Sequence, residues 1–524
     1  MDRLFAGLDI STQSAKLVLL NWTNGSVFYE DSLNYDLDLS HYGTKNGVIP
    51  NNDKSVSESN PKMWIEAVDI LFKRSKDKSI PLDQIKSISV SGQQHGLVSL
   101  DREGNLSRPL SKLWNDFSTQ KECDLLEKSI GGRSEMIEEV GNSQRAGYTA
   151  SKIYNMFLNE RARYDNTTVF LLVHNYINWH LTGGTSIMEE GDASGMALWN
   201  PVNKNWSEKV IGSIDESLKI KLPNVRSSKK TIGFISESLA KEFGFSPDCT
   251  IDSGSGDNMY GAIGTGNITP GLVTISLGTS GTAYTFLEKP YVDPSGEIAC
   301  FCDSTGNYLP LLCVSNMANG YNNYLKQNSL SHSDFDLLID KSKPGNNGKI
   351  LIPWFEGERT PDLPDAAPIY FGFKPEDFNR EVMGRALLEG HIQNLYDGFR
   401  RLPVKPKKIH LTGGMSKSRS WCQAIADIFS CETIPLESEG AAMGAALHAS
   451  WVWHNENREP KKINEVVEPF IRFNNKLLCR PREEFQKIYI DQKKLFSSLS
   501  KRVRGQESED PFKLFHQMVQ RKDI

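Results

Sequence analysis

The sequence predicts an α/β protein of two large domains around a central cleft. Its 524 residues exceed the length at which a single hydrophobic core usually stops growing. A strand–turn–strand pattern with hydroxyl and glycine residues at the turn occurs twice, at 4–22 and 272–286, which indicates one design used once per domain. We therefore expect domains at residues 1–250 and 251–500, followed by a charged tail at 501–524.

The charge balance argues against a polyanionic partner. There are 60 Lys and Arg residues against 65 Asp and Glu, a net charge of −5, so bulk charge would hold neither nucleic acid nor an anionic membrane. The eight cysteines are scattered without a CxxC pair or zinc spacing, which favours free thiols in a reducing cytosol. Asp9 interrupts the first apolar stretch, and no apolar run reaches about 18 residues. We expect a cytoplasmic protein, monomeric or homodimeric, whose partners are small molecules rather than nucleic acid or membrane.

The amino-terminal hairpin carries a polar cluster at its turn. Residues 4–22 read as two strands joined by a tight turn, and that turn places Thr12 and Gln13 beside the carboxylate of Asp9. Hydroxyls and amides at a turn suit an anionic ligand, while ordinary hairpin chemistry would produce the same residues. The pattern alone leaves both interpretations open.

A second polar set follows the strand expected at 84–92. Gln94 and His95 stand at its end, bracketed by glycines, which suits hydrogen bonding to a polar ligand, although a single histidine is more often structural. Trp114 and Asn115 follow in LWND, and this pairing offers one apolar and one hydrogen-bonding group to a sugar. The two motifs together favour a carbohydrate ligand.

The stretch at 249–266 places a single carboxylate, Asp257, on a glycine-rich turn. Five glycines between Gly254 and Gly266 permit positive φ angles and close approach of a ligand. A helix of small residues is expected to start just after Asp257. Gly-Asp-Asn is also ordinary turn and N-cap chemistry, so the turn becomes a candidate site only through the motifs around it.

The second half of the chain contains another set of residues suited to binding phosphate. The turn at Gly278 and Thr279 offers backbone N–H groups and a hydroxyl to an anion. A strand leads into Gly413 and Gly414 before the next helix, where a nucleotide could lie against the backbone, and the small-residue helix expected at 438–449 would admit a flat base. Neither a dinucleotide fingerprint nor a P-loop motif occurs, so bound phosphates would depend on the two hairpin turns.

The ordered set of motifs resembles the FGGY carbohydrate kinases over residues 5–499. This resemblance implies the two-domain actin-like and Hsp70-like ATPase fold, which is ribonuclease H-like. The motifs are, in chain order, GLDISTQSAK, SGQQHG, LWND, GDASG, SGSGDNMYGAIGTG, SLGTSGT, GERTPD, LTGGMSKS and EGAAMGAALHA.

The resemblance also implies roles for individual residues, with ATP and Mg²⁺ as cofactors. Asp257 would be the general base on the sugar hydroxyl, and Asp9 would face the magnesium ion. The residues implied to contact the sugar are Gln94, His95, Trp114, Asn115, Arg145 and Asn258. Those implied to bind the nucleotide are Thr12, Gln13, Gly278 and Thr279 at the phosphates and Gly413, Gly414, Ser418 and Gln423 at the adenosine.

The implied activity is ATP-dependent phosphorylation of a ketopentose, D-xylulose to D-xylulose 5-phosphate. The Gly-Asp-Asn around Asp257 is similar to family members that act on xylulose, whereas glycerol kinases carry Gly-Asp-Gln there. A kinase for another polyol or ketose, such as ribulose or glycerol, would keep Asp9 and Asp257 but change the sugar contacts. A non-enzymatic actin-like ATPase would explain the hairpins but leave GQQHG and LWND without a ligand.

Overall fold

A computed structural model describes residues 3–437 and 440–520. Its contacts divide the chain into two compact units that interleave along the sequence. The first unit comprises Met1–Ile268, Leu287–Leu309 and Glu439–Ile471, and the second comprises Thr269–Phe286, Pro310–Ser438 and Arg472–Ile524. The domain boundary that the sequence predicts at residue 250 stays a prediction. Among the described residues no helix is long and apolar enough to cross a bilayer.

The first unit is built on one seven-stranded mixed sheet. Its strands are β1 (Leu4–Ile10), β2 (Ser14–Asn21), β3 (Ser26–Asn34), β5 (Ile85–Gly92), β13 (Thr231–Phe234), β14 (Thr250–Asp252) and β15 (Ser255–Gly256). They lie in the order β13-β14-β5-β1-β2-β3, with β15 paired to β5 off this path. β1 runs antiparallel to β2 and parallel to β5, so the predicted hairpin and the strand before GQQHG are confirmed.

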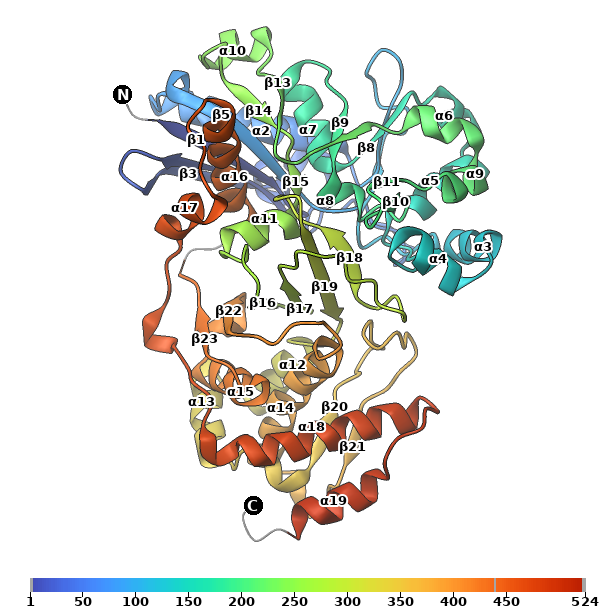
Figure 1. Cartoon of the computed structure of the whole chain (residues 1–524), viewed down its shortest axis with the longest axis vertical. Coiled ribbons are helices and arrows are strands. Elements are labelled where there is room, and N and C mark those ends of the chain that lie inside the picture. Colours follow the sequence, from blue (N-terminus) through green and yellow to red (C-terminus); the bar gives the residue numbers. More distant parts are fainter. Residues whose placement is uncertain (1–2, 438–439, 521–524) are drawn as a thin grey trace. The chain divides into compact units, whose positions relative to one another are not determined.

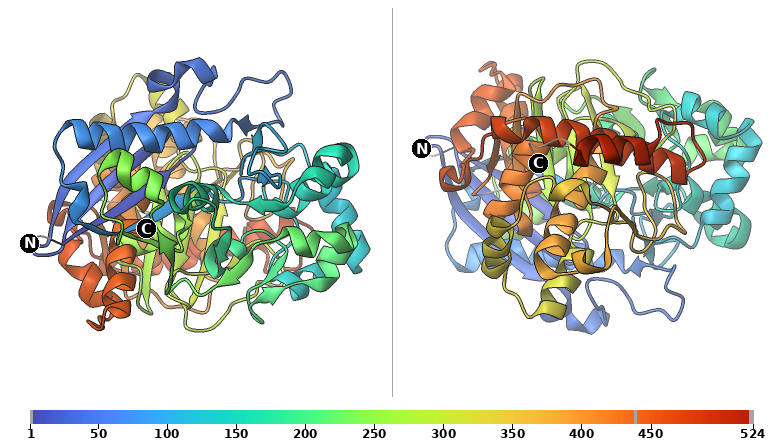
Figure 2. Two further views of the ribbon diagram at one scale, coloured as in Figure 1. Left: turned by 90° about the horizontal axis from the view of Figure 1, so that it is seen from above. Right: turned by 90° about the horizontal axis from the view of Figure 1, so that it is seen from below.

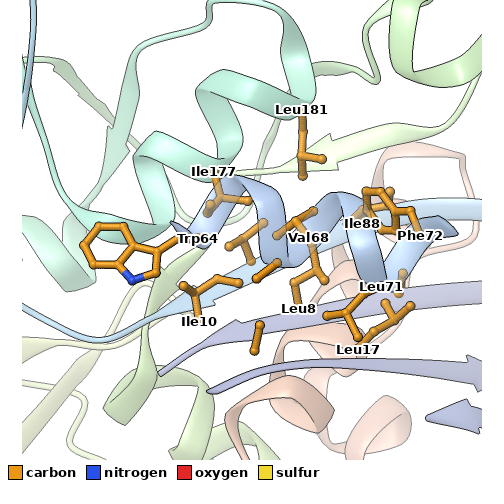
Figure 3. Close-up of a cluster of buried hydrophobic side chains, with 14 of the residues drawn as sticks. Leu8, Ile10, Leu17, Trp64, Val68, Leu71, Phe72, Ile88, Ile177 and Leu181 are labelled. Carbon is orange, nitrogen blue, oxygen red and sulfur yellow. The ribbon is translucent and has the colours of Figure 1, made fainter. Parts of the chain in front are cut away.

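The sheet of the first unit is covered on both faces, and the sequence of strand β2 reflects this. Leu17 and Leu19 belong to the hydrophobic cluster on one face, whereas Val18 and Leu20 belong to the cluster on the other. Because successive side chains of a strand alternate between faces, burial of both faces requires the continuous apolar run that β2 shows. The covering helices are α2 (Pro61–Asp77) and α7 (Val173–Thr182) on the first face and α11 (Asp257–Gly264) and α16 (Ala441–Glu456) on the second. Figure 2 (left) shows α2 running across the strands, and Figure 3 shows its side chains meeting those of α7 and the sheet.

Helix α16 comes from late in the chain yet packs against β1 and β5 (Figure 1). Small residues make this approach close. A Cβ atom on Gly7 would lie 2.0 Å from the carbonyl oxygen of Ala442, and one on Gly444 would lie 1.8 Å from that of Tyr260 in α11. The small residues expected at 438–449 to admit a nucleotide base are thus used to pack helix against sheet and helix against helix, and the first two of them lie outside the described residues.

A mainly helical lobe with its own hydrophobic cluster is inserted in the first unit. Between β5 and β13 the chain forms, besides α7, β6 (Val98–Leu100), β7 (Ser111–Lys112), α3 (Gln120–Ile130), α4 (Arg133–Val140), α5 (Thr149–Asn159), α6 (Arg161–Asn166), β8 (Val169–Leu171), β9 (Ile187–Glu189), α8 (Glu190–Ala193), β10 (Trp199–Asn200), β11 (Asn205–Trp206), α9 (Glu208–Ile214) and β12 (Asn224–Arg226). The unit also contains α1 (Tyr35–Asp38), β4 (Glu58–Ser59), α10 (Glu237–Phe243), β18 (Ala299–Cys302) and α17 (Ile463–Val467).

The second unit contains a further mixed sheet with helices packed on it. Its strands are β16 (Leu272–Leu277), β17 (Gly281–Thr285), β19 (Tyr308–Val314), β22 (Lys408–Thr412) and β23 (Thr433–Pro435), and a separate pair is β20 (Ile350–Ile352) and β21 (Ile369–Phe371). Within the sheet the order is β19-β17-β16-β22-β23, with β16 antiparallel to β17 and parallel to β22. The helices are α12 (Asn319–Asn328), α13 (His332–Lys341), α14 (Arg380–Phe399), α15 (Arg419–Phe429), α18 (Glu483–Val503) and α19 (Pro511–Val519).

Helix α19 lies in the segment that the sequence marks only as a charged tail. Asp510 caps its first turn, and Leu514 and Met518 are buried in a cluster with Trp354 and with Leu495 of α18. Figure 2 (right) shows α18 and α19 as consecutive helices at the end of the chain. The described part of this segment is therefore packed structure, because its few apolar residues recur at helical spacing.

Candidate active site

The parallel pairing of β1 with β5 builds the surroundings of Asp9. The register sets Asp9 opposite Ser91, whose Oγ donates a hydrogen bond of 2.7 Å to Asp9 Oδ1. Burial raises the pKa of Asp9 to about 6, against the lowering effects of the Ser91 hydroxyl and the charge of Lys16. The carboxylate is thus held at a defined place but is short of positive charge, which a cation would supply.

Asp257 is the first residue of α11, as the sequence predicts to within one position. The preceding strand β15 pairs with β5 at Ser91 and Gly92, which brings Asp257 to the same strand end as Asp9. Burial raises the pKa of Asp257 to about 8, and the negative charges of Asp9 and Asp192 add to that shift. A carboxyl group whose pKa approaches neutrality by burial and like charge is typical of a catalytic acid or base.

A hydrogen-bonded group of amides and acids surrounds Asp257. Asn258 Nδ2 donates to Asp257 Oδ1 at 3.1 Å and to Gln94 Oε1 at 2.8 Å, and Gln94 Nε2 lies 3.4 Å from Asp192 Oδ1. A Cβ atom on Gly256 would lie 2.6 Å from Gln94 Cγ, so the glycine before Asp257 is what lets Gln94 reach this position. The structure therefore brings together three of the residues that the sequence predicts.

His95 has a left-handed backbone with a φ of 65°, which is uncommon outside glycine. Its carbonyl oxygen accepts a 2.8 Å hydrogen bond from the buried ammonium of Lys152, and its ring lies 4.6 Å from that of Tyr148. Lys152 also donates to the carbonyl of Gly147, and burial lowers its pKa to about 7. These contacts fix the His95 loop against the turn that follows Arg145.

The LWND motif meets the amino-terminal hairpin turn. Trp114 Nε1 donates to Thr12 Oγ1 at 3.0 Å, and Thr12 Oγ1 lies 3.2 Å from Gln93 Oε1. Trp114 stays 37% exposed, which leaves its ring open to a ligand. Asn115 Oδ1 accepts from Ser57 Oγ at 2.7 Å. Two motifs that are about a hundred residues apart thus form one polar surface within the first unit.

Two further residues predicted in the first unit are placed differently. The guanidinium of Arg145 donates to the carbonyl of Gly296 at 2.9 Å, which ties it to the returning segment at 287–309. Gln13 is exposed, and its backbone carbonyl accepts from the amide of Tyr35. Their roles toward sugar and phosphate stay predictions.

In the second unit, two predicted nucleotide turns lie together. Since β16 and β22 are parallel, their following turns meet at one edge of the sheet, and a Cβ atom on Gly413 would lie 2.6 Å from the carbonyl oxygen of Leu277. Gly414 is exposed with no atom within 4 Å of a Cβ position, so the space above it is open. Thr279 is exposed beside Gly278. These four glycine and threonine positions share one surface.

Ser418 and Gln423 make contacts that stabilise α15. Ser418 caps the helix and donates to Asp336 Oδ1 at 2.6 Å. The amide of Gln423 donates to Asp427 Oδ1 at 3.1 Å and to the carbonyl of Arg480 at 2.8 Å. Their predicted role at the adenosine stays untested, and the contacts present are structural.

The sequence did not identify Ser91, Asp192, His174 or Glu189 as members of this group. Asp192 and His174 are fully buried and hydrogen-bonded at 2.8 Å. Glu189 accepts from two backbone amides and from Ser255 Oγ, and burial raises its pKa to about 8. Asp192 lies in the GDASG motif, but the sequence alone gives it no role, because its contact with Gln94 joins residues 98 positions apart and depends on tertiary structure.

Comparisons with known proteins identify the family. The chain matches the model of the FGGY family of carbohydrate kinases, N-terminal domain, at residues 4–264 and that of the C-terminal domain at 273–453. A xylulose kinase of Haemophilus influenzae is 35% identical over 461 residues, which cover 86% of this chain and 90% of the relative.

Solved structures share the fold. A ligand-bound xylulose kinase from Lactobacillus acidophilus has a TM-score of 0.84 and 22% identity, covering 96% of this chain and 98% of the other. A gluconate kinase from the same organism has a TM-score of 0.85 with the same identity and coverage. The fold is thus shared by kinases named for different sugars. The predicted two-domain actin-like α/β fold is confirmed, and the chain belongs to the FGGY family of carbohydrate kinases as an ATP-dependent sugar kinase.

Proposed function

We propose that this kinase phosphorylates D-xylulose to D-xylulose 5-phosphate, with Asp257 as the general base. The observation that carries the assignment of the base is the position of Asp257: a carboxyl group with a pKa of about 8, hydrogen-bonded to Asn258 and close to Asp9. The choice of sugar is supported by the Haemophilus influenzae relative, which is named a xylulose kinase.

In this proposal Asp257 accepts the proton of the sugar hydroxyl as that oxygen attacks the γ-phosphate of ATP. Phosphoryl transfer has a loose transition state, so the protein chiefly aligns the hydroxyl and removes its proton late. Oδ1 of Asp257 already accepts from Asn258, which leaves Oδ2 to take the proton. The amide oxygens of Gln94 and Asn258, which can each accept a further hydrogen bond, then hold the sugar near the base.

The residues near Asp9 fit a magnesium ion. Carboxylate oxygen is the ligand that Mg²⁺ prefers, and Mg²⁺ is usually held by one or two carboxylates together with phosphate oxygens and water. Among the described residues no group of three or more His, Cys, Asp or Glu side chains could hold a metal. Asp9, with Oδ2 outside its hydrogen bond to Ser91, would therefore face an ion that the nucleotide also binds. When bound, magnesium neutralises the negative charge that develops on the phosphate oxygens.

We assign the remaining contacts by position within each unit. His95, Trp114, Asn115 and Arg145 would contact the sugar from the first unit. Thr12, Gln13, Gly278 and Thr279 would bind the phosphates, and the open surface at Gly413 and Gly414 would take the adenosine. Ser418 and Gln423 would border it only if their present hydrogen bonds rearrange.

A screen of ADP release tests the substrate. We expect D-xylulose to give the highest kcat/KM among D-xylulose, D-ribulose, glycerol, D-gluconate and aldopentoses. Because a site that hydrogen-bonds particular hydroxyls rejects analogues lacking them, we expect discrimination of about a hundredfold or more. A higher kcat/KM for any other sugar would reassign the substrate, and a flat profile would remove the sugar site from the proposal.

A further inference from the structure

A chain of hydrogen bonds links the candidate base to buried backbone groups of the first unit. We propose that Asp192 and His174 are positioning residues for catalysis: they fix the orientation of the Gln94 and Asn258 amides and, through them, the carboxylate of Asp257. This inference rests on the proposed role of Asp257. Every bond in the chain joins residues of one compact unit.

The hydrogen-bond chain starts at Asn175, whose side-chain amide is oriented by two backbone groups. The amide N–H of Leu172 donates to Asn175 Oδ1 at 3.2 Å, and Asn175 Nδ2 donates to the carbonyl of Ile187 at 2.9 Å. A reversed Asn175 amide would lose both bonds. Asn175 Nδ2 also lies 2.8 Å from His174 Nε2, and since Nδ2 can only donate, Nε2 must accept and carries no proton.

The tautomer of His174 follows from this. A neutral imidazole with an unprotonated Nε2 carries its proton on Nδ1, which lies 2.8 Å from Asp192 Oδ2. Both side chains are fully buried. Asp192 therefore accepts from His174 through Oδ2, and its Oδ1 requires a second donor because a buried carboxylate oxygen without one is costly.

Gln94 supplies that donor, and this determines which end of its amide faces Asn258. Gln94 Nε2 lies 3.4 Å from Asp192 Oδ1, so Oε1 points the other way and accepts from Asn258 Nδ2 at 2.8 Å. Asn258 Nδ2 also donates to Asp257 Oδ1 at 3.1 Å. The orientation of each side-chain amide is thus determined by the hydrogen bond before it. Oδ2 of Asp257 and Oδ1 of Asn258 then remain to contact the substrate.

Packing leaves Gln94 little room to change rotamer. Gln94 is 4% exposed. A Cβ atom on Gly256 would lie 2.6 Å from Gln94 Cγ, and one on Gly195 would lie 3.2 Å from Gln94 Nε2. Rotation of the terminal amide remains sterically open, so its direction depends on the acceptor that Asp192 provides.

The first unit contains a second buried His–Asp pair that serves as a control. His448 Nδ1 lies 2.5 Å from Asp252 Oδ2, and both side chains are fully buried, as in the first pair. The other partners of His448 are the Tyr260 hydroxyl and the Ser304 carbonyl, so this pair does not contact Gln94 or Asn258. A variant of Asp252 alters a buried His–Asp pair without altering the hydrogen-bond chain to the base.

The test compares Asp192→Asn with Asp252→Asn by kcat over a range of pH. In Asp192→Asn the new amide oxygen must accept from His174 Nδ1–H, so its NH₂ faces Gln94 and reverses the amides up to Asp257. We expect the alkaline plateau of kcat to fall roughly 10- to 100-fold, as misaligned catalytic groups do, while Asp252→Asn retains it. We compare the plateau values of kcat because Asp257 is ionised at that pH. The lost charge of Asp192 changes kcat only at lower pH, where Asp257 is partly protonated.

Two further comparisons separate this role from damage to the fold. In a Gln94→Met background, Asp192→Asn should add no further loss of kcat, because the chain is already interrupted. His174→Leu should also lower kcat, because it removes the donor that holds the Asp192 carboxylate in position, while His174→Asn, whose amide N–H can replace Nδ1–H, should stay within about threefold of the parent. The comparison of His174→Leu with His174→Asn still tests the proposal if Asp192→Asn does not fold.

An unchanged plateau in Asp192→Asn, or independent losses that multiply in the double variant, would overturn the positioning role. Equal losses in Asp192→Asn and Asp252→Asn would do the same, because they would reveal a general cost of altering buried pairs. Near-parental turnover in Asp257→Asn is a different result: it would remove the proposed base itself, whatever Asp192 does.

Discussion

The surroundings of Asp257 oppose its charge, and this gives a prediction for the pH dependence. Only the carboxylate can accept a proton, and burial with the nearby charges of Asp9 and Asp192 raises the pKa to about 8. Activity should therefore fall as pH drops below that value and level off above it. We expect kcat/KM, measured with sugar and Mg-ATP both below their KM values, to rise about tenfold per pH unit on the acid side. A flat profile from about pH 6 to about pH 9 would be inconsistent with this base.

Asp9 gives a second prediction, because it differs from Asp257 in what it would face. Asp9→Asn keeps the hydrogen bond from Ser91 to the side-chain oxygen but removes a negative charge. The concentration of Mg²⁺ needed for half-maximal activity should rise roughly 10- to 100-fold, and added Mg²⁺ should restore part of the rate. The measurement is a magnesium titration at fixed ATP, with Asp257→Asn as the control that excess metal does not rescue. An unchanged titration for Asp9→Asn would move the metal elsewhere.

At the scale of elements, the helix that bears Asp257 depends on a glycine of α16, Gly444. Gly444→Ala would place a Cβ atom 1.8 Å from the carbonyl oxygen of Tyr260, so α11 and α16 must separate. We expect a loss of about 1–3 kcal/mol or more in the free energy of unfolding, together with a lower kcat. Gly212→Ala is the matched control, because Gly212 is helical in α9 and a Cβ atom there meets nothing within 4 Å. Urea unfolding should find Gly212→Ala unchanged or slightly more stable. A parental unfolding midpoint for Gly444→Ala would contradict the packing described.

The elements also explain what the sequence could predict. The hairpin of β1 and β2, the strand before GQQHG and the start of α11 were predictable because apolar alternation and glycine turns are local signals. The hydrogen bond between Asp9 and Ser91 was not, since it depends on the register of two parallel strands about eighty residues apart. The small residues of α16 have two physical uses, close helix packing and room for a ligand, and their pattern does not distinguish them. Family resemblance supplied residue roles that local pattern alone leaves open.

At the scale of the whole molecule, the proposed sugar contacts belong to the first unit and the adenosine contacts to the second. Their effects on binding should therefore separate. His95→Ala should raise the KM for sugar about 10- to 100-fold through a lost hydrogen bond and leave the KM for ATP nearly unchanged. Gly414→Val should do the reverse, because the space above Gly414 is free of protein atoms and the valine would obstruct only a ligand. Steady-state kinetics with each substrate varied in turn, together with a thermal melt of each variant, measure this. A rise in the KM for sugar alone in Gly414→Val would place the nucleotide elsewhere.

The turnover of Asp257→Asn tests the central claim most directly. Asparagine keeps the shape of the side chain and serves an N-terminal helix position about as well, so the fold and the binding of sugar and Mg-ATP should persist. The proton acceptor is needed only in the transition state, and we therefore predict a fall in kcat of about 10²- to 10⁴-fold with dissociation constants near those of the parent. Near-parental kcat in the folded, purified variant would contradict the account, because Asp257 would then be a turn residue and not the base.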